Sequence, residues 1–189
     1  MRNLFIALAA SLFVAGAAQA EPMEYKIDKG HTFITFEISH IGFAFLPGTF
    51  NDFDGSLTFD EANPENSSTE ITVDVASIDT EHAERDKHLR GEDFFNVEKF
   101  PTASFKSTGI EMDGNTGKLM GDLTIKGTTK PVTMDIELKN AAKDPWGNYR
   151  VAFEATTEIV LADFDIDNYG LGPASSTADV KIAVEATRK

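Results

Sequence analysis

Apolar and polar residues alternate along much of this chain, and this period of two strongly limits what it can fold into. In a strand, alternate side chains point to opposite faces of the sheet. Runs in which only every second residue is apolar therefore predict antiparallel strands with one dry face and one wet face. Six runs of this kind stand out, namely residues 53–59, 71–75, 119–125, 132–138, 149–155 and 180–184.

Three further segments (residues 25–28, 31–40 and 103–112) bring the expected number of strands to eight or nine. Within residues 103–112 the apolar parity reverses at Gly109, which predicts a β-bulge there. So many one-faced strands are best satisfied when the sheet closes, because closure removes exposed edges. We therefore predict an all-β fold, an antiparallel β-barrel of about eight strands.

Residues 82–90 form the one segment with convincing helical signals. Asp79 or Thr80 is expected to cap the start of this helix, and Gly91 is expected to end it. Asp86 and Arg90 are four residues apart and are expected to pair along one face. The sequence thus predicts one short, charged helix beside the barrel.

The first 20 residues have the character of a signal peptide. A basic start at residues 1–3 precedes an apolar stretch at residues 4–17, and a small-x-small site ends at Ala20. We expect cleavage after Ala20, export, and one domain over residues 21–189. No second apolar run approaches the length of a membrane span, and no cysteine could accept a lipid, so no stable membrane anchor is expected.

Composition excludes several classes of function. Without cysteine there are no disulfides, no thiolate catalysis and no cysteine zinc sites. The formal net charge is −14, and removal of Arg2 with the leader makes it −15. Phosphate backbones and anionic lipid headgroups would repel such a surface, so nucleic acid is not an expected partner.

The histidines do not have the spacing of a metal site. His82 and His88 are six residues apart, so they do not share one face of a helix. His31 and His40 would have to converge on them from another strand. No Gly-x-Ser-x-Gly motif is present, and no spacing predicts a Ser-His-Asp arrangement. We expect neither a metal site nor an enzyme.

Three connections between the expected strands are unusually apolar. They comprise residues 41–47, then Phe94 and Phe95 with Phe100, and finally Leu161, Phe164 and Leu171. Connections normally face water, so these either cap the barrel ends as small cores or line the mouth of an apolar cavity. Small residues with inward parity leave room inside and favour the cavity; they are Gly55, Ala103, Gly121 and Ala155.

Several motifs resemble those of the YceI-like family of periplasmic polyisoprenoid-binding proteins. In order along the chain they are residues 25–28, 48–50 with 53–55, 82–90, 99–101, 121–133, 144–147 and 171–175. They cover nearly the whole domain. The chain departs from the family in having Phe100 where tyrosine is common, and residues 44–47 match no family pattern.

The resemblance implies a lipocalin-like β-barrel in the periplasm that binds a polyisoprenoid, of the prenylated quinone type, and has no established enzymatic activity. No cofactor beyond this lipid is expected. The side chains expected to point inward and contact the tail are Phe36, Ile38, Phe43, Phe45, Phe94, Phe95 and Phe100. The candidates for the headgroup at the mouth are His40, Arg85 and His88.

Two other functions stay open on the sequence alone. The barrel could be filled by its own side chains and act in a stress response through protein contacts. It could also be a small periplasmic enzyme that uses His82 or His88 as acid or base. A homodimer is compatible with either.

Overall fold

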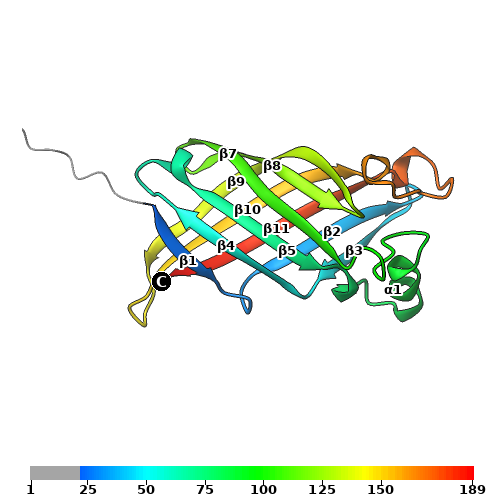
Figure 1. Ribbon diagram of the computed structural model, residues 1–189, viewed down its shortest axis with the longest axis horizontal. Helices are drawn as coiled ribbons and strands as arrows, with labels where there is room; N and C mark the ends of the chain where they lie inside the picture. The colour runs from blue at the N-terminus through cyan, green and yellow to red at the C-terminus, as the bar shows by residue number, and fades with distance from the viewer. Residues whose placement is uncertain (1–21) are drawn as a thin grey trace, which may run out of the picture.

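The computed structural model describes residues 22–189, so the predicted leader and its cleavage after Ala20 lie outside the described residues. The molecule is an elongated barrel whose strands run obliquely along its long axis (Figure 1). Helix α1 (Ala83–Arg90) lies at one end, and the C terminus lies near the other. Among the described residues, no helix has the length and apolar character needed to cross a bilayer.

Eight antiparallel strands close the barrel, in the order β1-β4-β5-β7-β8-β9-β10-β11 and back to β1. Their bounds are β1 (Met23–Ile27), β4 (Phe53–Phe59), β5 (Ser68–Asp74), β7 (Thr102–Asp113), β8 (Thr116–Ile125), β9 (Thr128–Lys143), β10 (Tyr149–Val160) and β11 (Thr177–Arg188). The all-β, closed antiparallel barrel with a single α-helix is confirmed for the described residues. The bulge at Gly109 is also confirmed, because the register between β7 and β8 shifts between Ser107 and Gly109.

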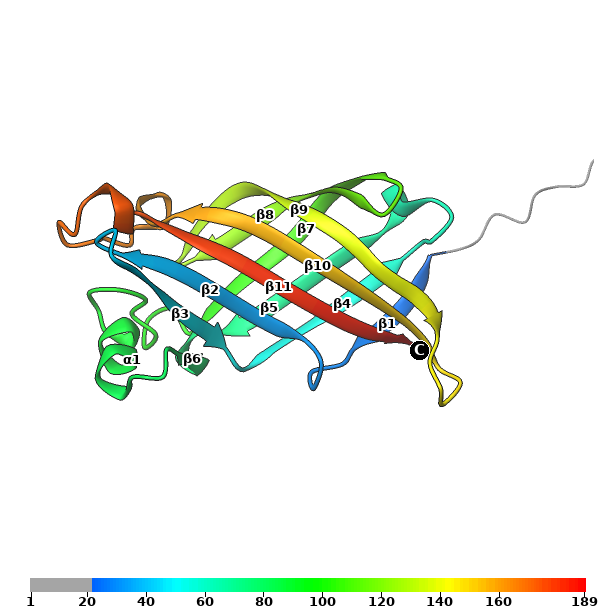
Figure 2. The ribbon, with the colours of Figure 1, turned by 180° about the vertical axis from the view of Figure 1, so that it is seen from behind.

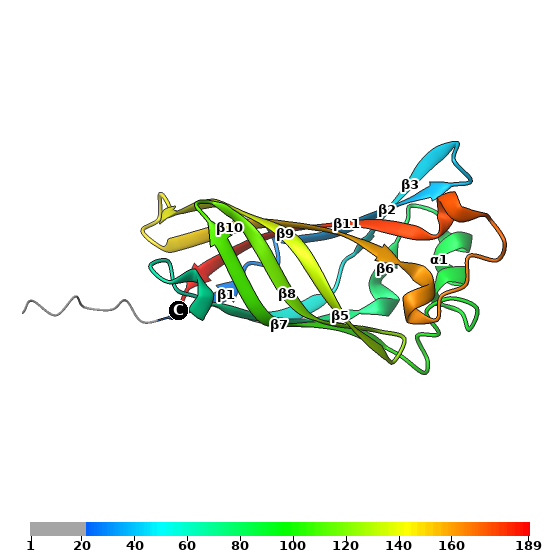
Figure 3. The same cartoon turned by 90° about the horizontal axis from the view of Figure 1, so that it is seen from above.

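Three more strands extend the wall at the α1 end, where β11 pairs with β2 (Phe33–His40) in place of β1. Strand β2 pairs with β3 (Ala44–Phe50), and β3 pairs briefly with β6 (Ile78–Asp79). The β2–β3 hairpin projects beyond the rest of the wall (Figure 3). Seen from behind, β2 and β3 continue the surface formed by β10 and β11 (Figure 2).

Short 3-10 segments make several of the connections. They are η1 (Pro64–Asn66), η2 (Val75–Ser77), η3 (Leu161–Phe164) and η4 (Pro173–Ser175). At the end opposite α1, Tyr25, Phe59, Val151 and Ala186 form a buried cluster. We call this end the closed end, because the cluster fills the barrel there.

Helix α1 is held by bonds to the backbone of its neighbours. The predicted caps are wrong: His82 is the N-cap, and its Nδ1 accepts a hydrogen bond from the Arg85 N–H. The predicted Asp86–Arg90 pair is also absent from the described residues. The Arg90 guanidinium instead donates to the carbonyls of Ala76 and Ile78. The reason is that β6 lies beside the helix and offers acceptors that local spacing does not reveal.

Candidate functional site

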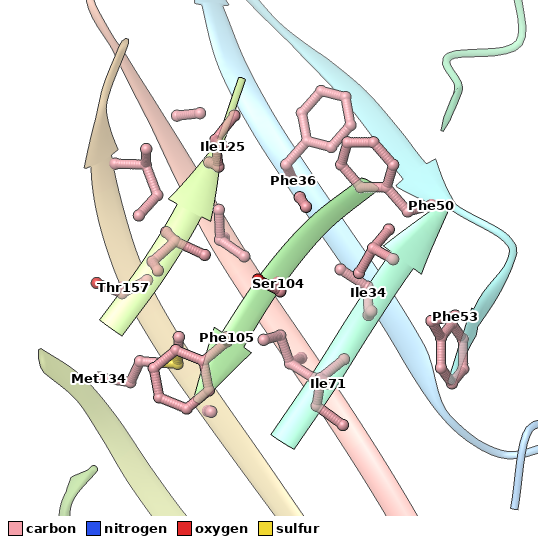
Figure 4. Close-up of a pocket in the computed structure, with 18 of the residues that line it drawn as sticks. Ile34, Phe36, Phe50, Phe53, Ile71, Ser104, Phe105, Ile125, Met134 and Thr157 are labelled. Atoms are coloured by element: carbon pink, nitrogen blue, oxygen red, sulfur yellow. The ribbon is translucent and has the colours of Figure 1, made fainter. Parts of the chain in front are cut away.

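The barrel encloses a cavity of about 640 Å³. Inward side chains from the strands line it, and aliphatic and aromatic groups dominate the lining (Figure 4). Figure 4 shows Ile34, Phe36 and Phe50 on one side of the space and Phe105 and Met134 on another. The volume of the cavity is typical of cavities that hold small molecules, which bind mostly through apolar contacts.

Two of the four small residues with inward parity leave room for a ligand. Ala103 and Ala155 line the cavity. The expectation is wrong for Gly55 and Gly121, which make room for side chains of the wall itself. A Cβ at Gly121 would lie 2.4 Å from the ring of Phe105, and one at Gly55 would lie 2.5 Å from Cδ1 of Ile71. These glycines allow large side chains to lie flat across a neighbouring strand.

The polar lining at the α1 end surrounds one permanent charge. Among the described residues that line the cavity, Arg85 is the one with a fixed charge. Its Nε donates to the Thr80 hydroxyl (2.8 Å), and its Nη2 donates to the Thr80 carbonyl (2.7 Å). The guanidinium is thus fixed in position at this end of an apolar space.

Asp86 helps to fix that arrangement. Its buried carboxylate accepts hydrogen bonds from the hydroxyl and the N–H of Thr80. The hydroxyl bond is the main reason that the pKa of Asp86 lies below its usual value, and burial opposes it. Arg85 and Asp86 therefore hold Thr80 from two sides, which ties α1 to the end of β6.

Aromatic rings at the α1 end form a chain of contacts. The ring of His88 meets Phe94 edge-on with centroids 4.9 Å apart, and Phe94 lies 5.3 Å from Tyr169. The Tyr169 hydroxyl donates to the Asp93 carbonyl (3.0 Å). This bond joins the segment after α1 to the segment after β10. Since His88, Phe94 and Tyr169 all line the cavity, we call this end the mouth.

Six of the ten residues proposed from the sequence line the cavity. They are Phe36, Ile38, Arg85, His88, Phe94 and Phe95. Whether they contact a ligand stays a prediction.

The prediction that Phe43 and Phe45 point inward is wrong, because their exposed fractions are 88% and 63%. Phe45 has the opposite parity to Leu46 and Phe50, which line the cavity from the same strand. Alternation within β3 would have placed Phe45 outside, had the strand been recognised.

His40 and Phe100 also lie outside the cavity lining. His40 is exposed at the end of β2. Phe100 packs over Gly127, where a Cβ would lie 2.7 Å from its ring, and the Lys99 ammonium lies 5.1 Å from its centroid. Phe100 therefore packs against the turn between β8 and β9 and does not line the cavity.

Several lining residues were missed by sequence reasoning. They include Ile34, Phe50, Phe53, Phe105 and Tyr169. The residues that lie in strands could have been predicted, because they fall on the same side of the strand as the inward-facing apolar residues. Tyr169 lies in a connection and carries no such signal.

One cluster of groups has the composition of a metal site. Single ligand atoms of Asp28, His31 and Glu185 lie within 4.8 Å of one another. The Arg150 Nη1 already lies between the two carboxylates, 2.7 Å from Asp28 and 2.8 Å from Glu185. The hydrogen bond between Arg150 and Asp28, followed by that between His31 and Asp28, lowers the pKa of Asp28 to about 2. The cluster is satisfied as an ion-pair network.

The comparison with family models and the comparison with curated proteins agree with each other. The model of the YceI-like domain matches residues 25–187. The UPF0312 protein plu2095 of Photorhabdus laumondii is 47% identical over 191 residues, which cover 100% of this chain and 99% of that protein.

Solved structures share the fold. BcnA of Burkholderia cenocepacia has a TM-score of 0.76 and 25% identity, covering 86% of this chain and 100% of its own. A polyisoprenoid-binding domain of Saccharophagus degradans has a TM-score of 0.65, covering 89% and 100%. At 13% identity, that domain shows likeness of fold alone.

Proposed function

The chain belongs to the YceI-like family, and we propose that it is an exported periplasmic carrier of a long polyisoprenoid lipid. The observation that carries this proposal is the apolar cavity of about 640 Å³ inside the barrel. The Saccharophagus degradans domain, which binds a polyisoprenoid and shares the fold, supports the class of ligand. The leader-like residues 1–20 support export.

The energetics favour exchange over trapping. A prenyl tail that buries ~500 Å² of apolar surface gains ~12 kcal/mol relative to water. Relative to a bilayer the gain is small, because the tail was already in hydrocarbon. A hollow apolar barrel would therefore move a lipid across an aqueous gap and release it again.

The mouth offers a place for a polar headgroup. Arg85 uses Nε and Nη2 to bind Thr80, and its Nη1 has no hydrogen-bond partner among the described residues. A carbonyl or hydroxyl oxygen of a quinone-type headgroup could accept a hydrogen bond from Nη1. The tail would then extend toward Phe105 and Met134 inside the barrel.

The cavity weighs against the barrel being filled by its own side chains. For an enzyme, the sequence offered His82 or His88. His82 is exposed and caps α1, and it does not belong to the cavity lining. His88 lines the mouth, but its Nε2 lies 3.3 Å from Asp93 at the surface. A binding role without catalysis is therefore the proposal.

Mass spectrometry of an organic extract of the purified protein tests this. We expect a co-purifying isoprenoid, or saturable uptake of offered quinones that carry isoprenoid tails of increasing length. Straight-chain fatty acids of similar size serve as the comparison ligand. Absence of both a co-purifying lipid and saturable uptake would overturn the carrier proposal.

A further inference from the structure

The tip of the β2–β3 hairpin exposes large apolar side chains. The exposed fractions are 45% for Ile41, 88% for Phe43 and 63% for Phe45. Both Ile41 and Gly42 have positive φ angles, 56° and 80°, which turn the chain tightly at this point. Figure 3 shows the hairpin reaching past the barrel wall at the α1 end. We call Ile41, Phe43 and Phe45 the hairpin tip.

Hydrogen bonds with Ser175 anchor the backbone of the hairpin turn. The Ser175 hydroxyl donates to the Ser39 carbonyl (2.7 Å) and accepts from the Ile41 N–H (3.2 Å). Ser175 is only 2% exposed. The apolar side chains are therefore presented by an anchored turn.

The charge pattern along the hairpin itself differs from that of the chain as a whole. Residues 38–51 contain no Asp, Glu, Lys or Arg, in a protein with a net charge of −14. A charge in hydrocarbon is costly, whereas exposed aromatic rings are favoured at a membrane interface. This segment therefore meets the conditions for contact with a lipid surface.

The hairpin tip is also continuous with the cavity mouth. Tyr169 and Leu171 line the cavity and are 53% and 45% exposed. They lie a few residues before Ser175, which anchors the tip. A Cβ at Gly42 would lie 3.9 Å from the Cβ of Ala174, so the turn of the hairpin lies beside the segment that carries Tyr169 and Leu171.

We propose that the hairpin tip inserts into the surface of an uncharged lipid bilayer and places the cavity mouth against it. The ligand would then pass between bilayer and barrel along apolar surface. This inference rests on the carrier function proposed above. Addition of a partner strand to the free part of the β3 edge is disfavoured, because Pro47 lacks an N–H.

The single tryptophan allows a direct test, since Trp146 lies in the turn between β9 and β10 at the closed end. The probe variant is Phe43→Trp in a Trp146→Phe background, purified after export. It is mixed with phosphatidylcholine vesicles that contain brominated acyl chains. We expect quenching and a blue shift of the tryptophan placed at position 43, and neither for Trp146 in the unchanged protein. No quenching at position 43 would overturn the proposal.

A second measurement separates docking from ligand binding. The double variant Phe43→Ser with Phe45→Ser is expected to bind an isoprenoid quinone in detergent as the unchanged protein does. Its rate of transfer of that quinone between vesicles is expected to fall about tenfold or more. Trp146→Ser is the control and is expected to keep the normal rate.

The remaining outcomes are distinct. If the unchanged protein does not bind the quinone, the carrier function is overturned, whereas quenching at position 43 would still support docking. An unchanged transfer rate in the double variant would overturn docking alone. If sedimentation shows a dimer that the double variant abolishes, and vesicles cause no quenching, the hairpin tip contacts a second copy and the bilayer proposal is wrong.

Discussion

At the closed end of the barrel Tyr25 and Phe59 are 1% and 3% exposed, whereas at the mouth Phe43 and Phe45 stand largely in solvent. The closed end also satisfies its polar groups. Arg188 donates to the Tyr25 hydroxyl (3.2 Å) and lies over the ring of Tyr149. At the mouth, β2 and β3 extend the wall without a full set of neighbours. Similar side chains thus stabilise the fold at one end and stay available for contacts at the other.

The largest expected effect concerns stability at the closed end. Phe59→Ala should lower the free energy of unfolding by about 3–5 kcal/mol, because it leaves a cavity in a packed cluster. Phe43→Ala should change it by less than about 0.5 kcal/mol, because the side chain is exposed. Urea unfolding followed by circular dichroism measures both. Equal losses would mean that the two ends are packed alike.

The ion-pair network of Asp28, Arg150 and Glu185 should make the free energy of unfolding depend on pH in the acid range. The pKa of Asp28 is lowered from 3.8 to about 2 by Arg150 and then by His31. A lowered carboxyl pKa contributes stability that is present above the unfolded value and is lost as pH falls toward the folded value. Asp28→Asn should therefore cost up to about 2 kcal/mol at pH 6.

This difference should shrink between pH 4 and about 2, as Asp28 becomes protonated in the unchanged protein. Urea midpoints at several pH values measure it. Asp163→Asn, on an exposed residue outside the network, is the matched control. A difference that stays constant down to pH 2 would contradict the assignment.

Filling the cavity should separate binding from stability. Ala155→Phe places a ring in the cavity and should weaken uptake of an isoprenoid quinone by about tenfold, while the protein stays folded and loses at most about 1–3 kcal/mol of stability. Ala152→Phe, on the outer face of the same strand, should leave uptake unchanged. Titration followed by fluorescence or calorimetry compares the two. Equal uptake by both variants would show that the ligand does not use the cavity.

The smallest expected effect concerns the anchor of the hairpin tip. Ser175→Ala removes the hydroxyl that bonds to Ser39 and Ile41, at a cost of about 1 kcal/mol. Hydrogen exchange should quicken in residues 38–46, with peptides from β9 as the internal control. Unchanged exchange there would mean that the hairpin is held by other contacts.

Much of the barrel was predictable from local patterns. Alternation in residues 132–138 predicted part of β9, and the parity change at Gly109 predicted the bulge between β7 and β8. Helix α1 was also predicted, but its cap was not. His82 takes that place, because Thr80 is bound by Arg85 and Asp86.

The candidate site was predicted only in part. Phe36, Phe94 and Phe95 were expected at the cavity and line it, whereas Phe43 and Phe45 do not. Two connections with similar apolar composition can differ in burial, one packed inside and the other exposed to solvent. The outcome depends on whether other strands reach it, and β2–β3 extends past the point where they do.

The sequence by itself determined that the chain forms one-faced strands and that their number suits a closed barrel, because side-chain alternation is a property of neighbouring residues. The tertiary structure alone decided that the barrel is hollow, that Gly121 accommodates Phe105, and that Arg85 faces the mouth. These features depend on distances between strands that are far apart in sequence. No local pattern contains such distances, so they emerge only when the sheet closes.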